Sequence, residues 1–200
     1  ILKIGVPTAG ESVSWNLAQM AVMVLISFHG TASIAAFTYF GTILRFIYMI
    51  AISIGSAAQI KTGHFCGAGL QETAYKKLFI YIASGAAFSL SIAFIVYLFR
   101  RQMIGIFTSD YEIRYILLTI MPISFFLETG RAVNVIAIPS LMASGDIHFP
   151  VKAGIFSNWC ISFGLAYVFS RILNWGFAGI IIAMACDECF RAIVMIFRWK

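Results

Sequence analysis

The side chains of this sequence that could do chemistry are polar residues set within long apolar runs. Glu11, Asn16 and Gln19 occur in the first run, and Asn16 and Gln19 share one face of a helix, with Glu11 at its margin. Burying a carboxylate in such surroundings is costly unless it is protonated, paired or hydrated. Glu11 is therefore predicted to bind a proton or a cation reversibly; the alternative is that it only bonds a neighbouring helix.

A second group of polar residues lies in the fourth apolar run. Glu128, Arg131 and Asn134 follow one another at steps of three, so Glu128 and Arg131 are predicted to form an ion pair within one helix. The pair is interpreted as a gate or as part of a cation path with Asn134; the alternative is a fixed salt bridge that orients helices. Pro122 and Pro139 in the same run each remove a backbone donor and are expected to bend or break the helix.

The last apolar run contains Asp187, Glu188 and Arg191. Asp187 and Arg191 are four residues apart, which predicts an ion pair within one helix, and a structural role is favoured for this group. Arg45, in the second run, has no acidic residue within a helical turn. It therefore requires a partner on another helix, for which Glu11 is a candidate.

A substrate cavity is predicted around the polar face of the first run. Trp15, Asn16 and Gln19 would contribute to it from the first helix, and Arg45 from the second. Aromatic rings in such a cavity stack on drugs and attract cations. The alternative for Trp15 is a position against lipid or at the membrane interface.

The helices that hold these residues are predicted from composition. Of the 200 residues, 61% are apolar and only 11% are charged, whereas a soluble domain has about a quarter charged residues. A bilayer core needs roughly 20 apolar residues per helix. The expected fold is therefore an all-α, polytopic integral membrane protein, with six transmembrane helices at about 4–28, 33–60, 77–99, 113–143, 150–169 and 176–198.

Charge placement predicts the orientation of these spans. Six spans put both ends on one side, and Lys and Arg concentrate on the cytoplasmic side of membrane proteins. The side of the ends would hold seven cations against four on the other, which predicts both ends in the cytoplasm. The net charge of +6 is scattered at the ends of apolar runs, so no nucleic-acid partner is expected. Cys186 and Cys189 lack further ligands, and neither a metal site nor an enzyme's catalytic constellation is expected.

Several motifs together resemble the multidrug and toxic compound extrusion (MATE) family. The pattern Gln59-x-x-x-Gly63-x-x-x-Gly67-Ala68-Gly69, followed by Glu72 and Ala74, resembles a cytoplasmic loop of that family. The segment 140–150 resembles its L-R-G-x-G-D-x-x-x-P motif, and Gly5-Val6-Pro7 with Glu11 resembles the first helix of its C-terminal lobe. Two departures are Arg131, where many members have an aspartate, and Met142, where the loop arginine is usual.

The resemblance implies a twelve-helix exporter of two six-helix lobes. Residues 1–200 would be the C-terminal lobe, a fragment of a longer chain whose N-terminal lobe is its partner. Such proteins sit in the cytoplasmic membrane and exchange Na⁺ or H⁺ for small amphipathic, often cationic compounds, without another cofactor. Glu11 matches a carboxylate that many members use for coupling. The alternatives are a lipid-linked-sugar flippase of related architecture and a membrane scaffold subunit that transports nothing.

Overall fold

Helices account for nearly all of residues 2–199, the part of the chain that the computed structural model describes. No strand occurs in that range, and the all-α prediction is confirmed. Ile1 and Lys200, the ends of the predicted lobe, lie outside the described residues. The elements in order are α1 (Leu2–Ser27), α2 (Thr31–Gly67), α3 (Gln71–Leu98), α4 (Arg100–Phe107), α5 (Tyr111–Ile120), α6 (Ile123–Ala143), α7 (His148–Phe156), η1 (Ser157–Phe163), α8 (Gly164–Tyr167), η2 (Val168–Ile172) and α9 (Gly176–Trp199).

The ends of the helices follow from local chemistry, and some differ from the predicted spans. The Asp110 side chain accepts hydrogen bonds from the backbone amides of Glu112 and Ile113, at 2.8 and 3.3 Å, and so caps the start of α5. α2 continues to Gly67, beyond the apolar run that ended at Ile60, because no residue of this stretch interrupts a helix. The residues between the third and fourth predicted spans contain the short helix α4.

Among the described residues, three helical rods are long and apolar enough to cross a bilayer: α2, α3 and the continuous rod His148–Ile172. α5 and α6 make a fourth if the bent pair is counted as one span. α9 has three charged residues within two turns, and α1 contains a carboxylate and two amides, which makes both less apolar. The count of six spans stays a prediction.

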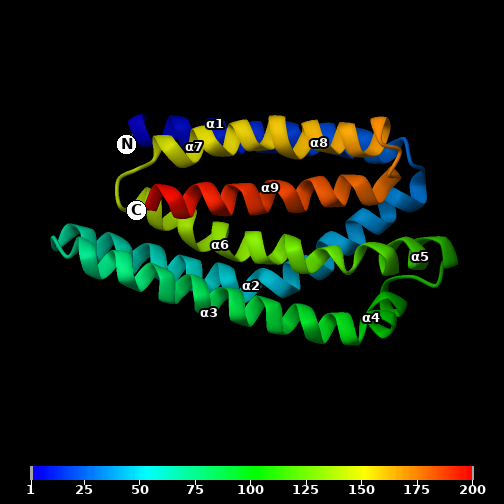
Figure 1. Cartoon of the computed structure of the whole chain (residues 1–200), viewed down its shortest axis with the longest axis horizontal. Helices are drawn as coiled ribbons and strands as arrows, with labels where there is room; N and C mark the ends of the chain where they lie inside the picture. Colours follow the sequence, from blue (N-terminus) through cyan, green and yellow to red (C-terminus); the bar gives the residue numbers. More distant parts are fainter. Residues whose placement is uncertain (1, 200) are drawn as a thin grey trace.

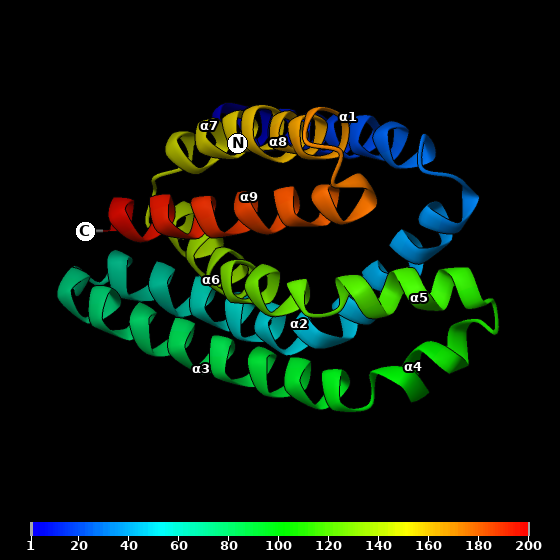
Figure 2. The same ribbon diagram turned by 45° about the vertical axis from the view of Figure 1, so that its right-hand side comes forward.

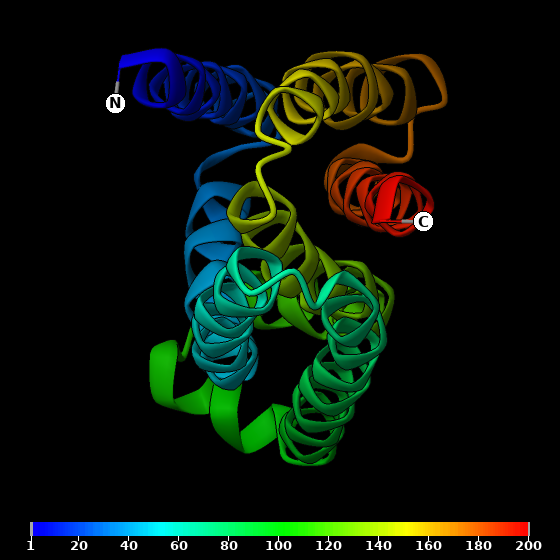
Figure 3. The same ribbon diagram turned by 90° about the vertical axis from the view of Figure 1, so that its left-hand side faces the viewer.

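The helices form two groups that meet along α6. α6 packs against α2 and α3 on one side and against α9 on the other. α1 and α9 both pack against the rod 148–172 (Figures 1 and 3). α2 starts beside α1 and runs obliquely into the group of α3 and α6 (Figure 2). α1 begins and α9 ends at the same end of the bundle (Figure 1); which side of a membrane this is stays a prediction.

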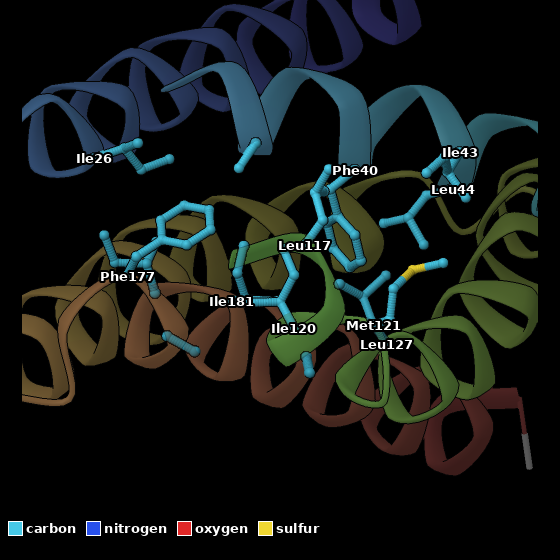
Figure 4. Packing of buried hydrophobic residues seen from close by; sticks show 14 of the residues in the cluster. Ile26, Phe40, Ile43, Leu44, Leu117, Ile120, Met121, Leu127, Phe177 and Ile181 are labelled. Carbon is cyan, nitrogen blue, oxygen red and sulfur yellow. The ribbon is translucent and has the colours of Figure 1, made fainter. Parts of the chain in front are cut away.

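A hydrophobic core joins the two groups at the other end of the bundle. Ile26 of α1, Phe40 of α2, Leu117 of α5 and Ile181 of α9 are at most 2% exposed and converge there (Figure 4). Burying each of these large side chains contributes about 1.5–3 kcal/mol. This core fixes the starts of α2 and α9 relative to each other, and so fixes the helices that carry the polar residues.

The two prolines of the fourth predicted span behave differently. α5 and α6 meet at 57° across Met121 and Pro122, so the predicted break at Pro122 is confirmed. Pro139 lies inside α6, which continues to Ala143. Proline has no amide hydrogen, so the carbonyl of Val135, four residues earlier, has no partner within the helix. That carbonyl lies against Gly55 of α2, where a Cβ atom would collide with it. The absence of a side chain at Gly55 thus lets α2 accommodate the free carbonyl.

The rod from His148 to Ile172 contains two π-helical segments, η1 and η2. η1 buries Ser157, Asn158 and Ser162, and it packs against α1 and α9. π-Helical turns are rare in proteins, but those that occur are often found at functional sites. Apolar periodicity alone gave no signal for them.

Candidate functional site

A cavity of about 750 Å³ lies where the two groups of helices face each other. Side chains from α1, α2, α6, α9 and η1 line it. Trp15, Asn16, Gln19 and Arg45, the four residues predicted for a substrate cavity, all belong to the lining. The structure brings them together; their contact with a substrate stays a prediction.

The α2 wall of the cavity is a single face of that helix. Arg45, Tyr48, Ile52, Ser56 and Gln59 line the cavity and follow one another at steps of three or four residues. Ser56 and Gln59 were not predicted as cavity residues. Their helical spacing from Arg45 is the signal that could have identified them.

Charged residues of α6 and α9 form a buried network beside the cavity. Arg131 Nε lies 3.1 Å from Glu188 Oε1, and Arg131 Nη1 lies 3.6 Å from Glu128 Oε1. The predicted pair of Glu128 and Arg131 is therefore present, but the closer partner of Arg131 is on α9. The guanidinium also lies over the ring of Tyr48, 4.9 Å from its centre. Arg131 thus connects α2, α6 and α9.

Glu188 is the centre of this network. Asn134 Nδ2 donates to both the backbone oxygen and Oε2 of Glu188, at 2.8 Å each. Arg191 Nη2 lies 3.4 Å from Glu188 Oε2 and 3.0 Å from Asp187 Oδ2, which confirms the predicted pair of Asp187 and Arg191. Ser157 of η1 donates to the other carboxylate oxygen of Asp187. Both carboxylates of α9 therefore have their partners within the chain.

The close approach of α6 and α9 makes these contacts possible. A Cβ atom at Gly130 would lie 2.5 Å from the backbone carbon and 2.8 Å from the backbone oxygen of Glu188. Glycine is therefore required where the two backbones cross. Arg131 and Asn134, on the same side of α6 as this crossing, reach Glu188 as a result.

Glu128 is the least solvated carboxylate of the network. It has no exposed surface and is absent from the cavity lining. Neither of its carboxylate oxygens has a hydrogen-bond donor among residues 2–199. Its contact with Arg131 is the longest of the ion pairs here. Glu128 is thus fully buried with one long ion pair and no hydrogen bond to its carboxylate among the described residues.

Glu11 lies apart from the cavity lining. Its carboxylate rests on α7, where a Cβ atom at Gly154 would be 2.7 Å from Glu11 Oε1. The pair of Glu11 and Arg45 considered from the sequence is not formed. Arg45 has no ion pair or hydrogen bond with any residue that the structure describes. The two residues are on helices that diverge, because α2 crosses obliquely away from α1 (Figure 2).

Within the described range, no three His, Cys, Asp or Glu side chains are arranged to hold a metal ion. Cys186 and Cys189 are free thiols, and the Cys189 thiol donates to the backbone oxygen of Phe126 at 3.5 Å. This bond joins α9 to α6 in addition to the charge network.

Comparison with known proteins gives related sequences along nearly the whole chain. The MatE family profile matches residues 7–168. The uncharacterized transporter YisQ of Bacillus subtilis (strain 168) is 37% identical over 202 residues, covering 100% of this chain and 44% of YisQ. A probable multidrug resistance protein NorM of Bacillus licheniformis is 26% identical over 202 residues, with the same coverage. The chain therefore spans less than half the length of these relatives.

Solved structures share the fold. A crystal structure of MATE in the bent conformation matches with a TM-score of 0.90 at 18% identity, over 99% of this chain and 44% of that one. An outward-facing conformation of a multidrug resistance MATE family transporter of the MOP superfamily matches with a TM-score of 0.90 at 18% identity, over 99% and 45%. The arrangement of α1 to α9 is thus found within longer chains.

Proposed function

Because this chain belongs to the MatE family, we propose that it forms one half of a secondary active exporter. The complete protein would exchange Na⁺ or H⁺ for small amphipathic compounds across the cytoplasmic membrane, with both ends of this segment in the cytoplasm. The proposal includes no cofactor besides the coupling ion. Its further partners are the membrane lipid and the other half of the chain.

The cavity of about 750 Å³ is the observation that carries this proposal. Ligand sites of drug size occupy roughly 300–1,000 Å³ and combine apolar walls with a few polar groups. Trp15 and Phe37 offer apolar surface here, and Gln19 and Gln59 offer amides. The cavity also lies between two groups of helices, which is where alternating access would open and close a transporter.

The charge network supports coupling between α6 and α9. Arg131 is shared by Glu128 on its own helix and Glu188 on the facing helix. The carboxylates of Glu128 and Glu188 compete for the guanidinium of Arg131. If Glu128 binds or releases a proton, its attraction for Arg131 changes, and the guanidinium shifts between the two carboxylates. In this proposal Glu11 is the residue that binds the coupling ion, and the network, with Asn134, transmits the change to the cavity.

The flippase alternative needs several free arginines to meet a pyrophosphate. Arg45, Arg131 and Arg191 all line the cavity, one more than the sequence suggested. Arg131 and Arg191 are each held by two carboxylates. One free guanidinium is a poor match for a doubly charged group, so the exporter is favoured.

The test uses the complete protein reconstituted in vesicles. Export of an amphipathic dye is measured with a Na⁺ gradient alone and with a pH gradient alone, for the wild type, Glu11→Gln and the control Glu72→Gln. Glu72 is an exposed residue of α3 paired with Lys76. We expect one of the two gradients to drive export in the wild type and in Glu72→Gln. In Glu11→Gln, export should no longer depend on that gradient. A protein that moves no dye under either gradient contradicts the exporter and favours the scaffold alternative, and unchanged coupling in Glu11→Gln refutes the role of that residue.

A further inference from the structure

We propose that Arg45 binds a singly charged acidic group of the transported compound, so that the preferred substrates are amphiphiles with a carboxylate or sulfonate. The proposal rests on the exporter function above and specifies its substrate class. It differs from the family expectation of a cationic compound. It depends on which charged groups of the cavity lining have a partner within the chain and which do not.

Arg45 lies deep in the predicted membrane region. It is 14 residues after Thr31, the first residue of α2, which corresponds to about 21 Å at 1.5 Å per residue. This depth is close to the middle of the span predicted at 33–60. An arginine at mid-membrane is costly unless it faces a partner or a water-filled cavity, and such residues mark substrate paths. Arg45 faces the cavity, so a role in binding is favoured over one in packing.

Arg45 is also the cavity cation without an internal partner. It is exposed and makes no ion pair or hydrogen bond with residues 2–199. Arg131 and Arg191 are compensated by the acidic residues of the network. A guanidinium presents a planar set of donors that fits carboxylate, sulfonate and phosphate groups in a bidentate manner. An acidic group that enters the cavity would therefore find one arginine available.

A cationic group would find no equivalent. The carboxylates that line the cavity are Asp187 and Glu188. Asp187 is bonded to Arg191 and Ser157, and Glu188 is bonded to both network arginines and to Asn134. Glu11 and Glu128, the two predicted site carboxylates with fewer partners, are absent from the lining. Among the described residues that line the cavity, Arg45 is thus the charged group that has no oppositely charged partner.

The surroundings of Arg45 suit the remainder of an amphiphile. Gln59, on the same face of α2, provides a further donor toward the cavity. Trp15 is 45% exposed and also lines it, so its ring is available to a hydrophobic body. One polar anchor beside apolar surface is the usual composition of a small-molecule site.

The experiment compares two dyes with the same xanthene ring system and single net charges of opposite sign, the sulfonate sulforhodamine B and the cation rhodamine 6G. Equilibrium binding to the complete purified protein is measured by fluorescence anisotropy, and gradient-driven export is measured in phosphatidylcholine vesicles. The variants are Arg45→Gln, Arg45→Lys and the control Arg101→Gln, an exposed residue of α4 outside the cavity lining.

We expect the wild type and the control to bind the anionic dye more tightly than the cationic one. Arg45→Gln should weaken binding of the anionic dye at least about tenfold, as expected for loss of a hydrogen bond between charged groups. Arg45→Lys should restore part of the affinity. Binding of the anionic dye that is unchanged in Arg45→Gln overturns the proposal, including the case in which the other half of the chain supplies a carboxylate to Arg45.

The outcomes separate this inference from the exporter function. Gradient-driven export of the cationic dye alone, unaffected by Arg45→Gln, would keep the exporter and refute the anionic substrate. Export of neither dye would refute the exporter, and the binding data would still decide whether Arg45 holds an anion. Loss of anionic-dye binding when phosphatidylglycerol, but not phosphatidylcholine, is added to the purified protein would show that a lipid headgroup takes the site, and would overturn its assignment to a substrate.

Discussion

The crossing of α6 and α9 gives a sharp prediction for Gly130→Ala in the complete protein. The new Cβ atom would lie 2.5 Å from the backbone carbon of Glu188 and 2.6 Å from the backbone nitrogen of Cys189. These are backbone atoms, so no side chain can rotate away. The shortest contact must increase from 2.5 Å to at least 3.4 Å, and the two helices must separate locally by about 1 Å.

The expected cost combines three terms. Overpacking of this kind costs about 1–3 kcal/mol. The hydrogen bonds from Asn134 to Glu188 are 2.8 Å long in the native structure, and weakening one that involves a charged group costs about 1.5–3 kcal/mol. Alanine is favoured over glycine in a helix by about 1 kcal/mol, which offsets part of the cost. We expect a net loss of about 3 kcal/mol. Because this segment covers 44% of its relative's length, the complete protein should melt at a temperature lower by roughly 3–6 °C.

The assay is thermal unfolding of the detergent-solubilised protein, followed by tryptophan fluorescence. Gly105→Ala in α4 is the matched control, because a Cβ atom there has nothing within 4 Å. The control should melt at the wild-type temperature or slightly above it. If Gly130→Ala melts with the control, the close crossing is not a constraint on the fold, and the reasoning is refuted.

Three further results are expected from the same protein. Glu188→Gln leaves two arginines undercompensated and should cost about 3–5 kcal/mol in thermal unfolding, whereas Glu72→Gln on the exposed surface should cost under about 1 kcal/mol; equal effects would contradict the network. Gly154→Ala should displace the carboxylate of Glu11, the proposed coupling residue, which lies against Gly154. Gradient-driven export should fall severalfold as a result, and normal export would count against a role for that contact. Burial, and secondarily Arg171, lower the pKa of His29 below its ordinary 6.5. The contribution of neutral His29 to stability should therefore be full above that pH and decline below it. The difference in stability between about pH 7.5 and about pH 5.5 should be smaller in His29→Gln than in the wild type.

The sequence was most informative where helical spacing alone decides a contact. The pair of Asp187 and Arg191 follows from a spacing of four, and it is present at 3.0 Å. The break at Pro122 follows from the missing amide hydrogen. The all-α membrane class follows from composition, because so few charges cannot cover a water-facing surface.

Contacts between helices could not be predicted in this way. The stronger partner of Arg131 is Glu188, 57 positions along the chain, and this pair depends on the crossing at Gly130. Whether Arg45 pairs with the candidate Glu11 could not be decided from the sequence for the same reason, since the angle between α1 and α2 is not encoded in the spacing of either helix. The roles of Glu11 and of the cavity residues in transport remain predictions.

The π-helical turns of η1 have a consequence for how this protein tolerates insertions and deletions. A π turn is equivalent to an α-helix with one extra residue, and the extra residue is absorbed locally. Loss of one residue within Ser157–Phe163 would convert the turn to ordinary α-helix while the flanking helix kept the same faces toward α1 and α9. A single-residue gap in an alignment of related chains at this point therefore does not imply that the surrounding helices have been redocked.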